Sequence, residues 1–120
     1  VCQTLDMART LSALPYNPGP VITVTREDLI WDLTIAEDGR LAMDGAAPSI
    51  IDWKNIASPT QRLPDAGCRL KHMTVSHTNA AQLAEWAERS LQDMRITFKY
   101  AEEPKITLTL TTPNGDVDLW

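Results

Sequence analysis

The sequence predicts an α+β domain, a two-layer sandwich in which helices cover one face of an antiparallel or mixed sheet. Three observations carry this prediction. Segments rich in β-branched residues alternate along the chain with segments whose apolar residues recur at helical spacing. Clusters of proline, glycine, asparagine and aspartate separate these segments. The length of 120 residues suits one hydrophobic core, so we expect a single domain over residues 1–120.

The N-terminal part is expected to hold one helix and one strand. A helix over Gln3–Leu14 is predicted from apolar residues at near-helical spacing, namely Leu5, Ala8, Leu11 and Leu14. Pro15 and the segment Asn17–Pro20 end this helix. The uninterrupted β-branched run that follows predicts a strand over Val21–Thr25, since such side chains suit a pleated surface.

A β-hairpin is expected next, with strands over Trp31–Ala36 and Arg40–Gly45 and a loop over Glu37–Gly39. A loop of three residues keeps the apolar side chains on one face, whereas a two-residue loop would place them on opposite faces. The pairs expected on the apolar face are Ile35 with Leu41 and Leu33 with Met43.

The middle of the chain predicts a second helix and another strand. Pro48 and Ser49 can open the helix, whose apolar positions are Ile50, Trp53, Ile56 and Ala57. Pro59 and Pro64 end it. The segment Cys68–Val75 is predicted to be a strand, and the slip in its alternation indicates a bulge or burial on both faces.

A third helix and a second hairpin are expected in the last third. Asn79 can cap the helix while Gln82 reaches back, and the apolar stripe is Leu83, Ala87, Leu91 and Met94. Clean alternation predicts strands over Arg95–Tyr100 and Lys105–Thr112, paired through the segment 101–104. A turn at 113–116 leaves Val117–Trp120 as a tail that either adds a strand or does not. This order of elements is close to a ferredoxin-like arrangement.

Charge and hydropathy exclude several classes of partner. The formal charge is −5, the isoelectric point is near 4.8, and the basic residues are scattered, so nucleic acid is not expected as a partner. No segment approaches the roughly 20 apolar residues of a spanning helix. The chain begins at Val1, which suggests a processed or excised piece, so membrane contact is expected only through a segment outside it.

Two cysteines, Cys2 and Cys68, are candidates for a disulfide. A bridge between them would close a loop of about 66 residues and stabilise the fold by roughly 4 kcal/mol on the chain-entropy model. The alternative is two free buried thiols. A bridge would indicate an oxidising compartment such as the periplasm.

The sequence predicts no catalytic residue, no metal site and no cofactor. Mechanistic motifs such as the P-loop, G-x-S-x-G and H-E-x-x-H are absent. Cys68, His72 and His77 could supply metal ligands on paper, but on one strand His77 would face away from the other two. Asp32 and Asp44 could approach each other across the first hairpin, yet both are expected to face water, where their pKa values would move little.

Candidate interface residues come from tryptophans and threonines. Trp53 and Trp86 lie on or beside apolar stripes and are expected in the core, as most tryptophans are. Trp120 is the tryptophan whose exposure the sequence leaves open. The β-prone, weakly charged strand that carries Thr107, Thr109 and Thr111 on one face could pair with a partner strand if it lies at a sheet edge.

Part of the chain resembles the periplasmic domains of the type IV pilus alignment complex and of type II secretion inner-membrane platforms. The residues that carry this resemblance are Leu14-Pro15, Val21–Thr25 and Asp38–Ser49, within residues 11–57. Ring-building domains of other secretion systems share the same rhythm of strand, Asp-Gly, strand, glycine and helix. The third helix, the cysteine pair and the segment Ser58–Pro64 depart from the pilus pattern.

The resemblance implies a non-enzymatic periplasmic component of an envelope-spanning assembly, anchored in the inner membrane by an upstream helix. Its partners would be other protein subunits, with a homodimer as one option. A free periplasmic or secreted binding module, inhibitor-like or immunity-like, is the second hypothesis. A small enzyme whose site is built from scattered residues is the third.

Overall fold

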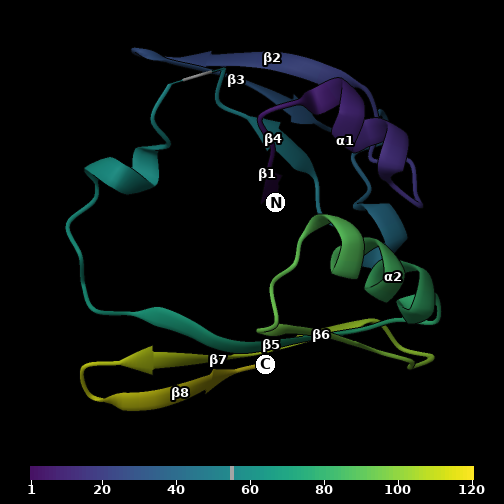
Figure 1. Ribbon diagram of the computed structural model, residues 1–120, viewed down its shortest axis with the longest axis vertical. Helices are drawn as coiled ribbons and strands as arrows, with labels where there is room; N and C mark the ends of the chain where they lie inside the picture. Colours follow the sequence, from purple (N-terminus) through teal and green to yellow (C-terminus); the bar gives the residue numbers. More distant parts are fainter. Residues whose placement is uncertain (55) are drawn as a thin grey trace. The chain divides into compact units, whose positions relative to one another are not determined.

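The computed structural model describes residues 1–54 and 56–120 (Figure 1). The chain divides into two compact units, Val1–Leu63 and Pro64–Trp120. Each unit holds one four-stranded sheet and one α-helix, so the predicted α+β class is confirmed. The expectation of a single sheet is wrong, because the described strands pair in two separate sheets. That the two units act together as one domain stays a prediction.

The first unit contains four strands, one α-helix and two single 3-10 turns. Its regular elements are β1 (Cys2–Gln3), α1 (Met7–Ala13), β2 (Val21–Arg26), β3 (Leu29–Thr34) and β4 (Ile50–Asp52). The sheet order is β1-β4-β3-β2, in which β1 runs parallel to β4 and the other pairs are antiparallel. The 3-10 turns cover Ala42–Gly45 and Pro59–Arg62.

The hairpin of the first unit joins β2 to β3, not the two segments expected from the sequence. Val24 lies opposite Trp31, and the two-residue turn contains Glu27 in the left-handed region at φ 55°. The predicted pairing of Trp31–Ala36 with Arg40–Gly45 is wrong. Met43 and Asp44 have φ values of 49° and 53°, which an extended strand does not allow.

The predicted helix that opens at Pro48 and Ser49 is also wrong, because Ile50–Asp52 forms the strand β4. Ile50 is completely buried, and its amide donates to the Thr34 hydroxyl over 2.8 Å. Two consecutive isoleucines suit a strand between β1 and β3 better than a helix. Residue 55, within the predicted helix, lies outside the described residues.

Helix α1 confirms the first predicted helix with a later start. The Asp6 carboxylate accepts from the Arg9 amide over 3.0 Å and caps the helix at its N-terminus. Gln3 belongs to β1 instead, where it lies opposite Ile51 of β4. No residue of α1 is fully buried, so this helix contributes little to the core.

The second unit contains four strands and one longer helix. Its elements are β5 (Arg69–Ser76), α2 (Ala80–Ser90), β6 (Ile96–Lys99), β7 (Lys105–Thr112) and β8 (Gly115–Leu119). The sheet order is β6-β5-β7-β8, with β6 parallel to β5 and the other pairs antiparallel. The predicted bulge in β5 is confirmed between Leu70 and His72. The tail after the turn does add a strand, β8.

The second predicted hairpin is wrong in its pairing, although both of its strands exist. Strand β5 lies between β6 and β7, so the segments Arg95–Tyr100 and Lys105–Thr112 do not pair with each other. An alternating pattern marks a strand and its faces but does not say which strand lies beside it. The hairpin that forms here is β7 with β8.

Helix α2 lies over one face of the second sheet (Figure 1). The expected stripe is confirmed at Leu83 and Ala87, and Trp86 is buried beside them. The stripe does not extend to Met94, whose side chain is 97% exposed. The predicted side-chain cap by Asn79 is wrong, because the Asn79 amide instead donates to His77 Nδ1 over 3.0 Å. None of the described helices is long and apolar enough to span a membrane.

Candidate functional site

A groove of about 560 Å³ lies between helix α2 and strand β6 in the second unit. Its helix side is formed by Ala84, Ala87 and Glu88, and its strand side by Ile96, Thr97 and Phe98; the connection adds Gln92, Asp93 and Met94. Most of this lining is apolar. The groove is therefore a surface on which another molecule could bury apolar side chains.

Strand β6 leaves one side of its backbone open along this groove. It ends the order β6-β5-β7-β8 and pairs with β5 alone among the described strands. The carbonyls of Arg95 and Lys99 accept from the amides of Met73 and His77 over 2.9 and 3.0 Å. Because successive residues of a strand point in alternate directions, the N–H and C=O of Phe98 point away from β5.

The charges around the groove differ in whether they already have a partner. Arg95 Nη2 lies 2.6 Å from Asp93 Oδ2, and hydrogen bonds from the Arg95 side chain and backbone lower the pKa of Asp93 to about 2. Glu88 has no ion pair among the residues that the structure describes. The groove thus carries one negative charge that a ligand could neutralise.

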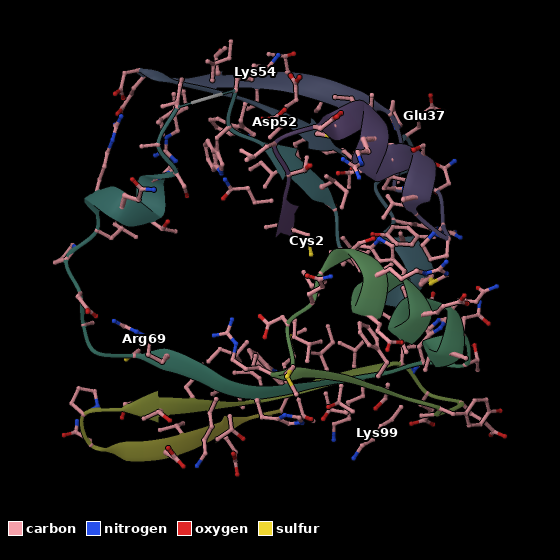
Figure 2. All side chains as sticks on the ribbon, viewed as in Figure 1. Cys2, Glu37, Asp52, Lys54, Arg69 and Lys99 are labelled. Atoms are coloured by element: carbon pink, nitrogen blue, oxygen red, sulfur yellow. The ribbon has the colours of Figure 1, made fainter. Side chains whose placement is uncertain are left out.

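The predicted interface threonines lie on the face of the second sheet opposite helix α2. Figure 2 shows Lys99 projecting from this same side of the sheet. Strand β7 lies between β5 and β8, so the condition for the expected pairing with a partner strand, a place at the sheet edge, is not met. The edge strands of this sheet are β6 and β8. Thr107 and Thr109 nevertheless line a second, smaller pocket on this polar face, together with Trp120.

Hydrogen bonds order the polar face around β8. The Thr109 hydroxyl donates to Asp118 over 2.6 Å, and the Thr111 hydroxyl donates to Asp116 over 3.0 Å. Lys71 forms an ion pair with Asp116. The hydrogen bond from Lys71 is the main reason that the pKa of Asp116 lies below its ordinary value. The hydrogen bond from Thr111 lowers this pKa further.

The cysteines and histidines considered for a metal do not gather. Across the described residues, no group of three histidine, cysteine or acidic side chains could hold a metal ion. His72 is exposed on β5, whereas His77 is buried in the connection between β5 and α2. The structure shows no bond between Cys2 and Cys68, which belong to different units, and the disulfide stays a prediction. Burial raises the pKa of the Cys2 thiol.

The two aspartates expected to face each other take separate places. Asp44 lies in the 3-10 turn, while Asp32 on β3 binds Lys54 over 2.8 Å and the Thr23 hydroxyl over 2.6 Å. Hydrogen bonds from Lys54 and then Thr23 lower the pKa of Asp32. Its cross-strand neighbour is Asp52, which Figure 2 shows on β4 near Lys54.

Sequence reasoning missed an aromatic face on the first sheet. Trp31 and Trp53 have ring centroids 5.2 Å apart, and the strand register places Val24 and Leu33 on the same face. None of these four side chains is fully buried. Trp53 is therefore half-buried and not in the core as expected, whereas Trp86 is buried as predicted.

The groove itself was not anticipated, although its parts were. The alternation of Ile96 and Phe98 predicted the apolar side of β6, and the α2 stripe predicted Ala87. Only the tertiary placement of α2 beside β6 brings these residues together.

Comparison with known proteins identifies a family for this chain. The family model described as a glyoxalase-like domain matches residues 1–91, which include all of the first unit and extend through β5 and α2. Both units follow the β-α-β-β-β order of such domains. No curated protein and no solved structure matches the chain.

Proposed function

The chain belongs to the glyoxalase-like domain family, and from that premise we propose that it is a non-enzymatic domain that binds an extended segment of a partner protein along β6. The family includes enzymatic and non-enzymatic members, so membership alone does not choose between catalysis and binding. The observation that carries the proposal is an open strand edge with an apolar groove directly beside it. An extended peptide can use both features at once.

Strand addition explains why β6 is favoured over the other edge of the same sheet. A peptide beside β6 would pair with the outward N–H and C=O of Phe98 and place alternate side chains in the groove. The opposite edge, β8, carries Asp116 and Asp118, and charges of this kind discourage pairing at an edge. The α2–β6 groove has no equivalent charge except Glu88 and the already paired Asp93.

The charge of the surface indicates the chemistry of the segment. Glu88 lacks a cationic partner among the described residues, and the chain as a whole carries a formal charge of −5. A partner strand with alternating apolar residues and a basic residue near Glu88 would complement both features. We therefore propose a basic, amphipathic strand as the occupant.

A synthetic peptide of alternating valine and threonine with a lysine at each end tests this proposal. Titration into the ¹⁵N-labelled protein should shift the backbone signals of Ile96–Lys99 and of the groove face of α2. A peptide with glutamate at both ends should bind more weakly, because it would face Glu88 with a like charge.

Two substitutions on the same helix provide a matched control. Ala84→Arg fills the groove and should lower affinity by about tenfold or more, whereas Ala81→Arg, exposed and outside the groove, should change it by less than about twofold. Circular dichroism of both variants checks that α2 is intact. Equal affinity of the two variants, or shifts confined to β2 or β8, would contradict binding at β6.

The setting of this interaction stays a prediction that rests on the two cysteines and on the pilus-like and secretion-like sequence pattern of residues 11–57, whose expected second hairpin strand and helix did not form. We propose a periplasmic assembly as the source of the partner, with a free periplasmic or secreted binding module as the alternative. Affinity capture from envelope extracts separates them. Recovery of pilus or secretion components supports the assembly, and recovery of one soluble enzyme or toxin supports the free module.

A further inference from the structure

A second pocket, of about 260 Å³, lies on the polar face of the second sheet, away from the α2–β6 groove. Three neighbouring strands contribute side chains to it: His72 from β5, Thr107 and Thr109 from β7, and Asp118 from β8. Leu108, Leu119 and Trp120 complete the lining. The pocket therefore combines hydroxyls, an imidazole, a carboxylate and an indole on a rigid sheet surface.

The two aspartates of β8 are neutralised to different degrees. Asp116 forms an ion pair with Lys71 and accepts the Thr111 hydroxyl. Asp118 accepts only the Thr109 hydroxyl and has no ion pair within the described part of the chain. Lys71 pairs with Asp116 and lies within electrostatic range of Asp118, but it forms no ion pair with Asp118, so that carboxylate can still accept a second cation in the pocket.

An aromatic ring lines the same pocket as this carboxylate. Trp120 is 81% exposed, although an indole is among the most favourable side chains to cover. A cation above an indole face is attracted by the ring quadrupole, and tryptophan is the strongest of the aromatic residues in this respect. A carboxylate beside the ring adds Coulomb attraction and a hydrogen-bond acceptor.

We propose that this pocket binds an organic ammonium group between the Trp120 ring and the Asp118 carboxylate. A primary ammonium has three N–H donors, which suit the acceptors Asp118 and the Thr107 hydroxyl. The alkyl chain behind the ammonium would lie along the indole. The group can belong to a free amine or to a lysine side chain of another protein, and both share this chemistry.

Titration with Nα-acetyl-lysine methylamide, monitored at the indole N–H of Trp120 by NMR, tests the site. The norleucine derivative keeps the four-carbon side chain but lacks the ammonium group, and it should cause no saturable shift. Butylammonium measures the free amine alone. Tighter binding of the lysine derivative than of butylammonium indicates that a lysine side chain is the source, and the reverse indicates a free amine.

Matched substitutions separate this site from general negative charge. Asp118→Asn should weaken binding by about tenfold, whereas Asp65→Asn, in the same unit but outside the pocket and paired with Arg69, should change it by less than about twofold. Trp120→Leu should weaken binding while the β7–β8 signals keep their positions. Equal shifts from the norleucine derivative, or equal effects of the two aspartate variants, would overturn the proposal. Failure of this ammonium site would leave the proposed binding at the β6 groove untouched, because Ala84→Arg tests that groove separately.

Discussion

The two units place the same sequence of elements, β-α-β-β-β, in different sheet orders. In the first unit the opening strand, β1, has two residues and lies at the edge beside the last strand, β4. In the second unit the opening strand, β5, has eight residues and lies inside the sheet, with β6 parallel to it after α2. The comparison teaches that strand length and helix packing, more than element order, decide which strands become neighbours.

The helix of the second unit also packs more firmly on its sheet than the helix of the first unit. Helix α1 has no fully buried residue, whereas α2 buries Ala80, Leu83, Trp86 and Ala87. An amphipathic helix that packs firmly on a sheet brings the next strand back beside the first, as in a βαβ unit. The result for function is that the second unit covers one face with α2 and leaves β6 at an open edge.

The largest expected effect tests whether the units differ in stability as well as in order. Ile50 and Leu83 are both completely buried, one in each unit. Ile50→Ala and Leu83→Ala should each lower the free energy of unfolding by about 2–5 kcal/mol. Urea denaturation followed residue by residue by NMR would show which signals each change affects. If both variants destabilise all residues equally, the units unfold as one and the comparison concerns topology only.

A smaller effect is expected at Gly19 in the first unit, which lies against the end of β3. Its φ is 88°, and a Cβ there would lie 2.4 Å from the Ile35 carbonyl oxygen. Gly19→Ala should cost about 2–4 kcal/mol, because it combines left-handed strain with a backbone clash. Gly39→Ala is the control, since its φ of 71° is also left-handed but nothing lies within 4 Å. Equal thermal midpoints for the two variants would show that the close approach at Gly19 carries no cost.

The hydroxyl of Thr34 is expected to stabilise β4 by a somewhat smaller amount. Thr34 is completely buried and accepts the Ile50 amide over 2.8 Å. Thr34→Val keeps the shape but leaves that buried amide without its acceptor, so we expect a loss of about 1–3 kcal/mol. Thr34→Ser restores the hydroxyl and should recover most of the hydrogen-bond energy in the same denaturation assay. A valine variant as stable as the wild type would show that the Ile50 amide has found another acceptor.

Much of the secondary structure could be predicted from the sequence, and most of the strand pairing could not. The alternation in β7 and the apolar stripe of α2 are local patterns, and both elements formed as expected. Ile50–Asp52 was predicted as helix because the spacing of the apolar residues Ile50, Trp53 and Ile56 fits the period of a helix. The segment forms a strand instead, because it is buried between β1 and β3. The turn at Glu27 contains no glycine, so its left-handed residue left no recognisable signal.

The candidate site was harder to predict for the same reason. Thr107, Thr109 and Trp120 were selected as interface residues, and the structure does bring these three to one pocket. The open edge, however, belongs to β6 and not to β7, because β5 inserts between them. Insertion of a strand between two others depends on contacts far apart in the sequence, which alternation does not encode.

The smallest effect concerns chemical reactivity and involves no change in fold. Cys68 is exposed, whereas Cys2 is half-buried and burial raises the pKa of its thiol. At pH 8 iodoacetamide should therefore alkylate Cys68 well before Cys2, because the thiolate is the reactive species. Mass spectrometry counts the adducts over time. If neither cysteine reacts until a reductant is added, the two are bridged, and the predicted oxidising compartment gains direct support.

Hydrogen exchange at β6 tests the proposed open edge most directly. In the free protein the Phe98 amide should exchange much faster than those of Thr97 and Lys99, which point toward β5. On addition of the valine–threonine peptide, Phe98 should become protected while its neighbours change little. Protection of Phe98 equal to that of its neighbours without peptide would mean that this edge is already covered, and would contradict the account.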